Sequence, residues 1–564
     1  MYQTKVNSLN PRGQQAQSLL QISTVRSFEG GLNVTDTDLN MSPKYAKVLD
    51  NLERSTDGSL TLRPGTKLLT NHITDTSDIV NHVYFNGVIW SVQVSGNITT
   101  TDGAGTVTVK TIPAPGWTGG ITFVDFTVFN SDLLIVNGKD KPLIVSGHPT
   151  RPDGSANPNF NQIQFLADLA TTSNVNVPVG KYIIAHGQFT VIAGVTAAPS
   201  TIFISHEDSS GTWFGDGPPN NAVNLDLGPR VSLGGATITG MVAYRDKLLV
   251  TFERGVLPVN LGVFIGTPSV HSPTDDGFIE EFGCLAHRSL ISVGDDTFFN
   301  DNVGVNSITR INVFNTLRPV RASHLVDPLI TALIQPLSTA QIEKSVFAVY
   351  DLRNFRYMLF IPVLAADGVT VTETICFSYT NIPTLKITAW ARLRGWKWQS
   401  ACRTALQNIV FSRGNKLYTY DFDGTQNADR FGDPAVQGGT GEPVAFTWEL
   451  PWADFKHRMD IKVTRYVSLD TTGKAQFTME TYVDNILDQP AYSAVPYIAG
   501  SGPGYGVDGY GKAYGGGGRR AGDERLLAVT AKFKLMKLRF FGSTKEKLRF
   551  ISVSLAYLHG SIRR

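Results

Sequence analysis

Residues that can do catalytic chemistry are present in the chain, but not at the spacings that catalysis uses. The sequence contains no Walker phosphate loop, no His-Glu-x-x-His, no Gly-x-Ser-x-Gly and no Cys-x-x-Cys. Two carboxylate pairs, Asp275-Asp276 and Asp295-Asp296, lie in turn contexts, where Asp is favoured because it caps backbone amides. The sequence therefore predicts no catalytic residue, no cofactor and no metal site, and we expect a protein that is not an enzyme.

The most suggestive enzymatic stretch is residues 205–213, which reads Ser-His-Glu-Asp-Ser-Ser-Gly-Thr-Trp. It resembles the Asp-box of sialidases, Ser-x-Asp-x-Gly-x-x-Trp, but each of its three spacings differs by one residue and the stretch occurs once. In sialidases that box is a structural turn on a propeller blade, away from the catalytic groups. Retaining glycoside hydrolysis needs two positioned acidic groups, or a Tyr nucleophile with an Arg cluster, and the sequence assigns neither.

Apolar strands and polar turns alternate through residues 79–425. The turns are centred near residues 86, 131, 187, 245, 295, 353 and 414, at steps of roughly 45 to 61 residues. Since a four-stranded blade needs about 40 to 50 residues, we expect a mainly β fold with a β-propeller of six or seven blades. An irregular β-sandwich with coincidental hairpins is the alternative. Within the sixth blade, Asp327-Pro328 and the capping-box spacing of Ser338 and Gln341 predict two short helices.

Two segments precede the repeats. Residues 1–26 show no clear periodicity and predict an extended arm that becomes ordered against a neighbouring subunit. Residues 27–78 form an opening segment in which Gly30-Gly31 permits a sharp turn or a close backbone approach. A helix is predicted over residues 42–52, because Ser42-Pro43 suits a helix start and apolar residues follow at helical spacing.

Residues 426–564 are expected to form a C-terminal β-barrel or sandwich, since they contain long β-rich runs. The apolar positions change parity between Leu535 and Met536, and again between Phe550 and Ile551. Because side chains alternate between the faces of a strand, such a change predicts an extra residue in the ladder. We therefore expect a β-bulge at each of these two places.

A Gly-rich loop, residues 500–522, interrupts this C-terminal domain, and it contains too much Gly to pack a core of its own. Its candidate channel or docking residues are Tyr505, Tyr510, Tyr514, Arg519 and Arg520. Residues 512–564 hold 13 Lys or Arg against 3 Asp or Glu, a net charge of +10, which leaves −8 for the rest of a chain of net charge +2. This basic end suits DNA phosphates, an acidic protein partner or a solvated strand face, and all three remain open.

Composition indicates a folded chain of two or three domains, with 564 residues, 42% apolar and 17% charged. The three cysteines, Cys284, Cys376 and Cys402, are widely separated and odd in number. They fit neither a disulfide framework nor a zinc cluster, so we expect buried free thiols in a reducing cytosol. Neither a signal peptide nor an apolar run long enough to cross a membrane is expected.

The opening segment resembles that of the tail nozzle proteins (tail tubular protein B) of short-tailed bacteriophages. The residues that carry the resemblance are Phe28, Gly30, Gly31, Leu32, Asn33, Ala46, Leu49, Asn51, Arg63, Pro64, Gly65 and Thr66. The resemblance implies a structural virion protein that forms a homo-oligomeric ring, commonly a hexamer, below the head–tail adaptor. Such a ring surrounds the DNA exit channel, contacts the genome transiently during ejection and docks distal tail parts such as fibres, spikes or a needle.

The same resemblance implies further expectations. The protein would be located in the tail of the virion after assembly in the host cytoplasm, and it would not insert into a membrane on its own. Asp208 and Trp213 would be structural residues at a blade corner, because nozzle proteins place a similar turn there. The loop at residues 500–522 would form a constriction or a docking contact in the ring. Two alternatives remain: a propeller glycan hydrolase or depolymerase, and a carbohydrate-binding propeller without catalysis.

Overall fold

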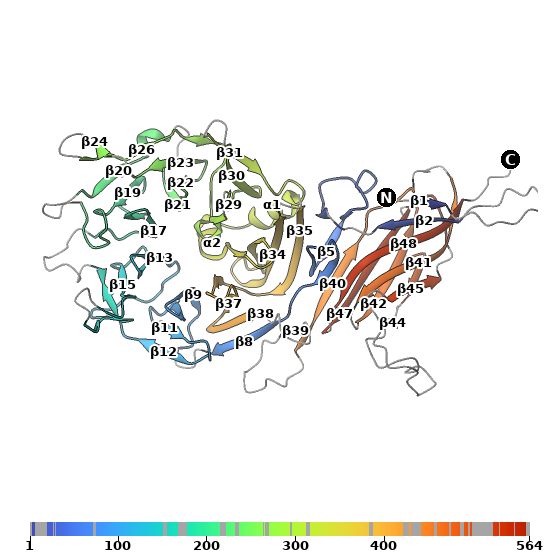
Figure 1. The fold of residues 1–564 in the computed structure, drawn as a ribbon, viewed down its shortest axis with the longest axis horizontal. Coiled ribbons are helices and arrows are strands. Elements are labelled where there is room, and N and C mark those ends of the chain that lie inside the picture. Colours follow the sequence, from blue (N-terminus) through green and yellow to red (C-terminus); the bar gives the residue numbers. More distant parts are fainter. Residues whose placement is uncertain are drawn as a thin grey trace, which may run out of the picture.

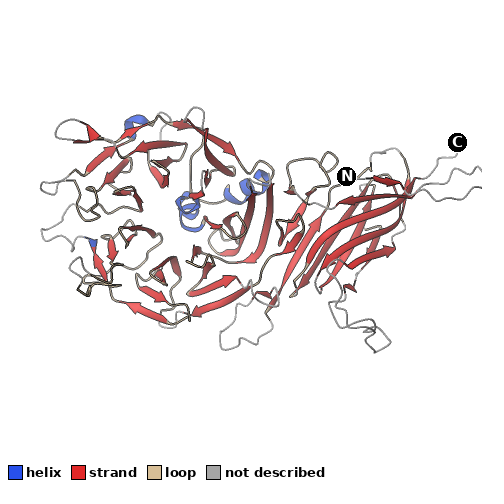
Figure 2. Cartoon of the chain, in the orientation of Figure 1, coloured by secondary structure: helices blue, strands red, loops and turns tan. Residues whose placement is uncertain are grey.

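The computed structural model consists mainly of strands, with two short α-helices among the described residues (Figure 2). The described residues are 3–5, 20–25, 28, 30–71, 75–150, 155–166, 177–214, 221–231, 236–262, 264–265, 270–293, 296–311, 316–382, 387–420, 428–429, 441–455, 460–472, 475–484, 490–494, 497–498, 523–528, 531–545 and 547–559. The predicted mainly β fold with a propeller is confirmed, and a second β unit lies beside the propeller (Figure 1).

The described strands of the propeller form seven groups of four or five around one axis (Figure 1). Blades 1 to 3 contain β9 (Ile79–Phe85), β10 (Val88–Gln93), β11 (Ile98–Thr101), β12 (Val107–Lys110), β13 (Asp125–Phe129), β14 (Asp132–Val136), β15 (Leu143–Val145), β16 (Ile163–Phe165), β17 (Tyr182–His186), β18 (Phe189–Ala193), β19 (Thr201–Ile204) and β20 (Val223–Asp226). Blades 4 and 5 contain β21 (Ile238–Tyr244), β22 (Lys247–Phe252), β23 (Gly255–Asn260), β26 (Thr274–Asp275), β27 (Ile279–Glu280), β28 (Ile291–Val293), β29 (Asp296–Asn300), β30 (Val305–Ile311) and β31 (Thr316–Arg321). Blades 6 and 7 contain β32 (Phe347–Asp351), β33 (Arg356–Leu364), β34 (Val371–Ile382), β35 (Ile387–Trp396), β36 (Ser400–Arg403), β37 (Ile409–Arg413), β38 (Lys416–Tyr420) and β8 (Thr66–Asn71). A separate hairpin of β24 (Phe264–Ile265) and β25 (Val270–His271) lies between β23 and β26 in the sequence.

A strand from the N-terminal side closes the last blade. β8 pairs antiparallel with β38, so that Thr66 lies opposite Tyr420 and Thr70 lies opposite Leu417. Backbone hydrogen bonds therefore join the two ends of the propeller, and the ring does not depend on side-chain packing alone. β8 supplies the outermost strand of blade 7, and β36, β37 and β38 are its first three strands. The turn near residue 414 joins the second and third of these, β37 and β38.

Tight turns explain why the repeat was visible in the sequence. In blade 1, Asn86 and Gly87 join β9 to β10 and both have positive φ angles, 47° and 82°. Turns of this kind match the twist of the strands on either side, and Asn-Gly adopts them with little strain. Between the turns, Leu133, Leu134 and Ile135 of β14 are all fully buried, because neighbouring blades cover both faces of each sheet.

Two further sheets form a β-sandwich beside the propeller (Figure 1). The first sheet contains β1 (Gln3–Lys5), β2 (Leu20–Val25), β48 (Arg549–His559), β41 (Lys462–Thr472) and β45 (Asp523–Ala528), with β46 (Lys532–Phe533), β6 (Leu52–Arg54) and β7 (Leu60–Leu62) attached. The second sheet continues from β35 of blade 6 through β5 (Val48–Asp50), β40 (Glu442–Glu449), β47 (Met536–Thr544), β42 (Ala475–Val483) and β43 (Tyr492–Ala494). The short strands β3 (Gly31–Leu32), β4 (Tyr45–Ala46), β39 (Ala428–Asp429) and β44 (Tyr497–Ile498) attach to the second sheet.

Aromatic side chains fill the space between the two sheets of the sandwich. The ring of Phe550, from the first sheet, lies 5.2 Å from Trp448 and 5.4 Å from Phe477 of the second sheet, measured between centroids. Phe28 packs edge-on against Trp448 at 4.8 Å. Aromatic contacts of this kind dominate the energetics of a core, so the opening segment is part of the sandwich core and not a surface extension.

Part of the predicted N-terminal arm packs on the chain itself. β2, within residues 1–26, pairs antiparallel with β48, and the hydroxyl of Tyr557 donates a 2.9 Å hydrogen bond to the Gln21 side chain. For residues 20–25, the neighbour that orders the segment is therefore the chain's own sandwich. The other described residues of the arm, 3–5, form β1 and pair with β2.

The helix predicted over residues 42–52 is wrong, because these residues form β4, β5 and the start of β6. Each of the three strands has a different partner: β4 pairs with β3, β5 with β40 and β35, and β6 with β7. Ala46, Leu49 and Leu52 are all buried, one from each strand. Their spacing of three residues imitates a helix, although it arises because the chain changes direction between short strands, with Asn51 at a φ angle of 57°.

The two predicted β-bulges have different outcomes. At Ile551 the bulge is confirmed: Asp470 pairs with Ser552 while Thr471 pairs with Phe550, so Ile551 is the extra residue. The predicted bulge between Leu535 and Met536 is wrong. There the chain leaves β46 of the first sheet and enters β47 of the second, and this change of sheet produces the change of parity.

Two α-helices, α1 (Asp327–Ile334) and α2 (Thr339–Ser345), lie in the connection between blades 5 and 6. α2 begins where the sequence predicted, with a complete capping box between Ser338 and Gln341. α1 also forms, but Val326 and not Asp327 is its N-cap, so Asp327 and Pro328 both lie in its first turn. The 3-10 helices η2 (Gly228–Arg230) and η3 (His287–Ser289) lie in other connections of the described chain. None of the helices in the described part of the chain has the length and apolar character needed to span a bilayer.

Candidate functional site

Helix α2 reaches across the propeller towards blade 3, although it directly precedes blade 6 (Figure 1). Its Glu343 carboxylate accepts hydrogen bonds from Lys181 Nζ at 2.9 Å and from the Tyr182 hydroxyl at 2.8 Å. Burial, together with the negative charge of Glu343, holds the pKa of Tyr182 well above its usual value, so this hydroxyl remains a donor. Hydrogen bonds therefore fasten α2 to the far side of the ring.

Arg288, in η3, connects further blades across the same axis. Its guanidinium donates to the carbonyl oxygens of Lys344 and Gln399, both at 3.0 Å, and to Asn81 Oδ1 at 3.4 Å. Burial lowers the pKa of Arg288 to about 10, which still leaves it cationic at neutral pH. Since Asn81 lies in blade 1 and Gln399 directly precedes blade 7, this single side chain joins connections that are remote in sequence.

His287, the neighbour of Arg288, contacts blade 2. Its Nε2 lies 2.9 Å from Asp125 Oδ2, and the same oxygen accepts the backbone amide of Ile183 at 2.9 Å. Hydrogen bonds from the side chains of η3 and α2 to blades 1, 2 and 3 thus cross the propeller axis. A polymer cannot pass through the propeller along this axis unless these contacts break.

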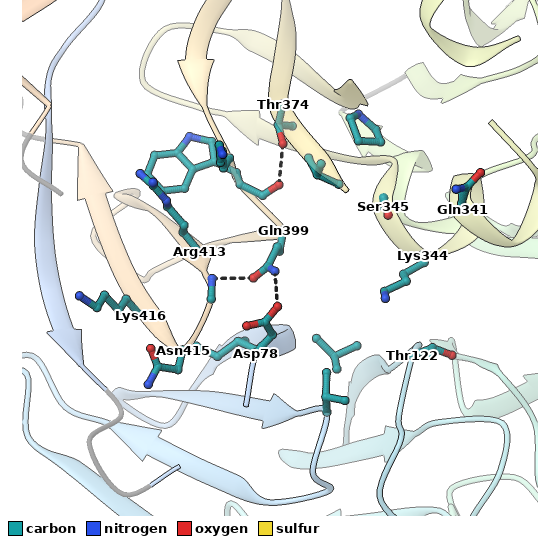
Figure 3. Close-up of a pocket in the computed structure, with 18 of the residues that line it drawn as sticks. Asp78, Thr122, Gln341, Lys344, Ser345, Thr374, Gln399, Arg413, Asn415 and Lys416 are labelled. Carbon is teal, nitrogen blue, oxygen red and sulfur yellow. Dashed lines mark hydrogen bonds between the residues drawn. The ribbon is translucent and has the colours of Figure 1, made fainter. Parts of the chain in front are cut away.

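A cavity of about 710 Å³ opens beside this network, between α2 and the connections of blades 1, 6 and 7 (Figure 3). Segments that lead into innermost strands contribute Asp78, Ser345 and Gln399. The turn between β37 and β38 contributes residues 413–416. These two kinds of connection meet at the same end of a propeller, because neighbouring strands in each blade are antiparallel.

Hydrogen bonds fix one wall of the cavity (Figure 3). Gln399 Nε2 donates to Asp78 Oδ2 at 2.9 Å, and Gln399 Oε1 accepts the backbone amide of Gly414 at 2.8 Å. The Thr374 hydroxyl donates to the carbonyl oxygen of Trp398 at 3.1 Å. This wall is therefore positioned by its own contacts and does not need a ligand to order it.

The charges around the cavity are mostly positive. Four cationic side chains line it, and Asp78 is the single carboxylate among its described lining residues. The cations are Lys344, Lys397, Arg413 and Lys416. No local sequence motif identifies this site, because its residues come from separate connections of blades 1, 6 and 7 and from α2. The charge of this lining favours an anion over a cation as a ligand.

The residues that resemble nozzle proteins lie where the sandwich meets the propeller. Arg63 Nη1 lies 2.9 Å from Asp429 Oδ1 and Nη2 lies 2.5 Å from Oδ2, and Arg63 Nε donates to Asn51 Oδ1 at 3.0 Å. Thr66 adds a hydrogen bond to Asp429 at 3.0 Å. The Arg63 guanidinium also lies 4.2 Å from the ring centroid of Trp396 in blade 6. We call Asn51, Arg63, Thr66 and Asp429 the junction cluster.

Two more ion pairs tie the opening segment to blade 6. Asp50 pairs with Arg392 at 2.5 Å and 2.9 Å, and Glu53 pairs with Arg356 at 2.5 Å while accepting the Ser378 hydroxyl at 3.0 Å. Buried charges are costly unless they are paired and hydrogen-bonded, and these pairs meet that condition. The opening segment therefore fixes the sandwich against the propeller by charge pairs as well as by apolar packing.

The Gly-Gly step of the opening segment is required by close contacts. A Cβ atom added at Gly31, where φ is +65°, would lie 2.5 Å from the backbone oxygen of Trp390. A Cβ atom at Gly30 would collide with the ring of Tyr45. The two glycines thus let β3 approach β35 of blade 6 directly.

The residues expected at a blade corner and in the Gly-rich loop differ in what the structure describes. Asp208 and Trp213 lie in the connection between β19 and β20, where Asp208 has a φ angle of 57° and Trp213 is buried between blades 2 and 3. Trp213 Nε1 donates to the carbonyl oxygen of Ser210 at 3.1 Å. The candidate loop residues, Tyr505, Tyr510, Tyr514, Arg519 and Arg520, lie outside the described residues.

The predicted carboxylate pair Asp275-Asp276 is engaged in ion pairs. Asp275 pairs with Arg230, and Asp276 pairs with Lys247. Asp295 of the second pair lies outside the described residues. Among the residues that the structure describes, no group of three or more His, Cys, Asp or Glu side chains is placed to hold a metal ion.

The three cysteines are free and buried. Burial raises the pKa of Cys284 to about 12 and raises the pKa values of Cys376 and Cys402 as well. A thiol acts as a nucleophile only when it is ionised, so these three are suited to packing rather than to catalysis.

The lysines of residues 532–537, which a solvated strand face would expose, lie in or next to strands of two different sheets and differ in exposure. Lys532 and Lys534 are exposed, as a solvated face requires. Lys537, in contrast, is 5% exposed and pairs with Glu449 and, at 3.5 Å, with Asp38. A solvated face therefore fits Lys532 and Lys534 but is wrong for Lys537, because Lys537 belongs to β47 in the middle of the second sheet, between β40 and β42.

No protein-family model matches the chain, and no curated protein sequence is significantly similar to it. Three solved structures share a likeness of fold. The streptogramin B lyase structure is 10% identical with a TM-score of 0.37 and covers 63% of this chain and 97% of that one. The Neurospora crassa Pan2 WD40 domain is 6% identical (TM-score 0.36; 65% and 98% covered), and BamB from Moraxella catarrhalis is 12% identical (TM-score 0.33; 75% and 98% covered).

Proposed function

We propose that the chain is a structural subunit of a short-tailed phage tail, a nozzle protein that assembles into a ring, hexameric as the resemblance implies. One observation carries the proposal. Of the twelve residues that carry the resemblance to nozzle proteins, eleven are buried, and Pro64 is half-buried. They concentrate where the opening segment joins the sandwich to the propeller, so the resemblance falls on the residues that determine how the two parts are connected.

The closed axis of the propeller supports a ring. Arg288, His287 and Glu343 connect blades across the axis, so a DNA duplex has no route through a single subunit. A DNA path in a protein of this kind would therefore lie between subunits, around the centre of a ring. In that arrangement the head–tail adaptor and the distal tail parts would contact the two open faces of the ring.

The enzymatic alternative gains no support from the cavity at the end of the propeller. Glycoside hydrolysis by the usual routes uses two carboxyl groups that flank the scissile bond. The described lining of this cavity contributes one, Asp78, and it accepts a hydrogen bond from Gln399. We therefore propose a non-catalytic role for the propeller in the assembled tail.

The test is the oligomeric state and shape of the purified full-length chain. We expect mass photometry to report a closed assembly of six 61.4 kDa copies that persists on dilution, as a permanent interface requires. Negative-stain images should show a ring with a central opening. A monomer at all concentrations, or an open filament in place of a ring, would refute the proposal.

Two variants test whether the junction between the sandwich and the propeller is needed for assembly. Phe28→Ala removes the aromatic ring that packs on Trp448 within the sandwich core. We expect this variant to lose rings because the sandwich is disturbed. Phe355→Ala changes an exposed Phe in the turn between β32 and β33 and should leave the fold of each subunit intact. If Phe28→Ala formed rings as well as wild type, the junction would not be needed for assembly.

A further inference from the structure

The cavity at the end of the propeller has a charge composition that the ring proposal does not explain. Lys344, Lys397 and Lys416 line it, and none of them forms an ion pair with another described residue. Arg413 adds a fourth cation. Because the whole chain has a net charge of only +2, this concentration of positive charge is a local feature of the fold.

The neighbouring acidic group faces elsewhere. Glu343 precedes Lys344 in α2, but its carboxylate is directed to Lys181 and Tyr182 of blade 3. Arg288 lies behind the cavity and donates to the carbonyl oxygens of Lys344 and Gln399, so it adds buried positive charge to the wall. Charge in a concave site of low dielectric attracts counter-ions more strongly than the same charge on an open surface.

The neutral and acidic groups of the cavity add a second kind of recognition. Asp78 accepts from Gln399 through Oδ2, and its Oδ1 faces no hydrogen-bond donor among the described residues. Ser345 and Thr122 also line the cavity, and their hydroxyls have no hydrogen-bond partner in the described chain. Asp78 is exposed, so water can donate to this oxygen while the cavity is empty. A ligand that displaces the water must supply a donor of its own, which a ligand hydroxyl can do and an anion without hydroxyl groups cannot.

We propose that this cavity binds a small hydroxylated anion, that is, a sugar ring that bears a carboxylate or a phosphate. The lysines and Arg413 neutralise the anionic group, and Asp78, Ser345 and Thr122 contact ring hydroxyls. The volume of about 710 Å³ lies within the range of roughly 300 to 1,000 Å³ that small-ligand sites occupy. Apolar residues, including Val80, Val94 and Leu364, form the remaining wall. The site does not depend on ring formation.

Isothermal titration of the purified full-length chain with four probes tests the proposal. The probes are a glucuronate-containing disaccharide, ribose 5-phosphate, a neutral disaccharide and inorganic phosphate. We expect at least one hydroxylated anion to bind ten-fold or more tightly than both the neutral sugar and inorganic phosphate, and to bind less tightly as salt is raised. Binding of the disaccharide alone assigns the site to acidic glycans, and binding of ribose 5-phosphate alone assigns it to sugar phosphates.

Variants connect the binding to the cavity. Lys344→Gln, Lys416→Gln and their combination should each weaken binding, the combination by at least ten-fold, with unchanged melting temperatures. Lys141→Gln, an exposed lysine of blade 2 outside the cavity, is the matched control and should bind as wild type does. The proposal is overturned if no hydroxylated anion binds, if the neutral sugar or inorganic phosphate binds equally well, or if the combined variant retains wild-type affinity. These outcomes leave the ring proposal untouched.

Discussion

Replacing Arg63 by Met tests whether the junction cluster holds the propeller closed. The side chain of Arg63 is 2% exposed, and Asp429 is 6% exposed. Arg63→Met removes both bonds to Asp429, the bond to Asn51 and the contact with Trp396, while Asp429 stays buried with a charge. Removing one partner of a buried ion pair typically costs about 3 to 5 kcal/mol, because the remaining charge is uncompensated. We expect Arg63→Met to lower the stability of this region by the same amount.

The matched control is an ion pair in the same part of the fold that is more exposed. Arg394 pairs with Glu373 at 2.9 Å, but its side chain is 45% exposed. Exposed pairs contribute about 0 to 1 kcal/mol, so Arg394→Met should have a small effect. The double variant Arg63→Met/Asp429→Leu should regain much of the loss of Arg63→Met, since an apolar pair can replace a buried ion pair at little cost.

Native-state hydrogen exchange is the appropriate assay, because a 564-residue chain does not unfold in one two-state step. The free energy of opening is read from the amides of β8 and β38, the strands that close the ring and lie next to the cluster. A change below about 1 kcal/mol for Arg63→Met would refute the reasoning. So would a double variant that is less stable than Arg63→Met.

Three other changes have expected outcomes of their own. Gly31→Ala should destabilise the protein in urea by about 2 kcal/mol or more, since φ is +65° and the new Cβ would lie 2.5 Å from a backbone oxygen. Gly87 also has a positive φ angle, but an added Cβ atom would meet open space, so Gly87→Ala should destabilise the protein less. Equal losses of stability in the two variants would contradict this argument. Burial alone raises the pKa of Asp75, but hydrogen bonds from Ser95, Ser77 and Asn97 outweigh it and lower the pKa to about 2. Because the folded pKa lies below the usual 3.8, this stabilisation is present above pH 3.8 and lost as the pH falls towards 2. Asp75→Asn should remove that part of the pH dependence of urea unfolding. Identical pH profiles for Asp75→Asn and wild type would exclude this contribution of Asp75. Shortening residues 502–518 to a four-residue turn should leave rings intact but reduce DNA retention in filled heads and infectivity, and unchanged virions would show that the loop is dispensable.

Features encoded by neighbouring residues were predictable from the sequence. Asn86-Gly87 encodes its own turn, and the capping box of Ser338 and Gln341 encodes the start of α2. The repeated turns revealed the propeller for the same reason, since each hairpin is specified within a few residues. The bulge at Ile551 was visible because the side-chain pattern along a single strand records it.

Contacts between distant residues were decided only by the tertiary structure. Arg63 and Asp429 are separated by 366 positions, and no local pattern identifies them as partners. The cavity likewise combines Asp78, Lys344 and Gln399 from separate connections. Residues 42–52 show why local patterns can fail: a spacing of three residues fits a helix, but pairing of the backbone with β40 and β35 favours strands. The sequence determined where the chain turns, and long-range pairing and burial determined which segments the turns bring together, because both depend on surfaces that exist only after folding.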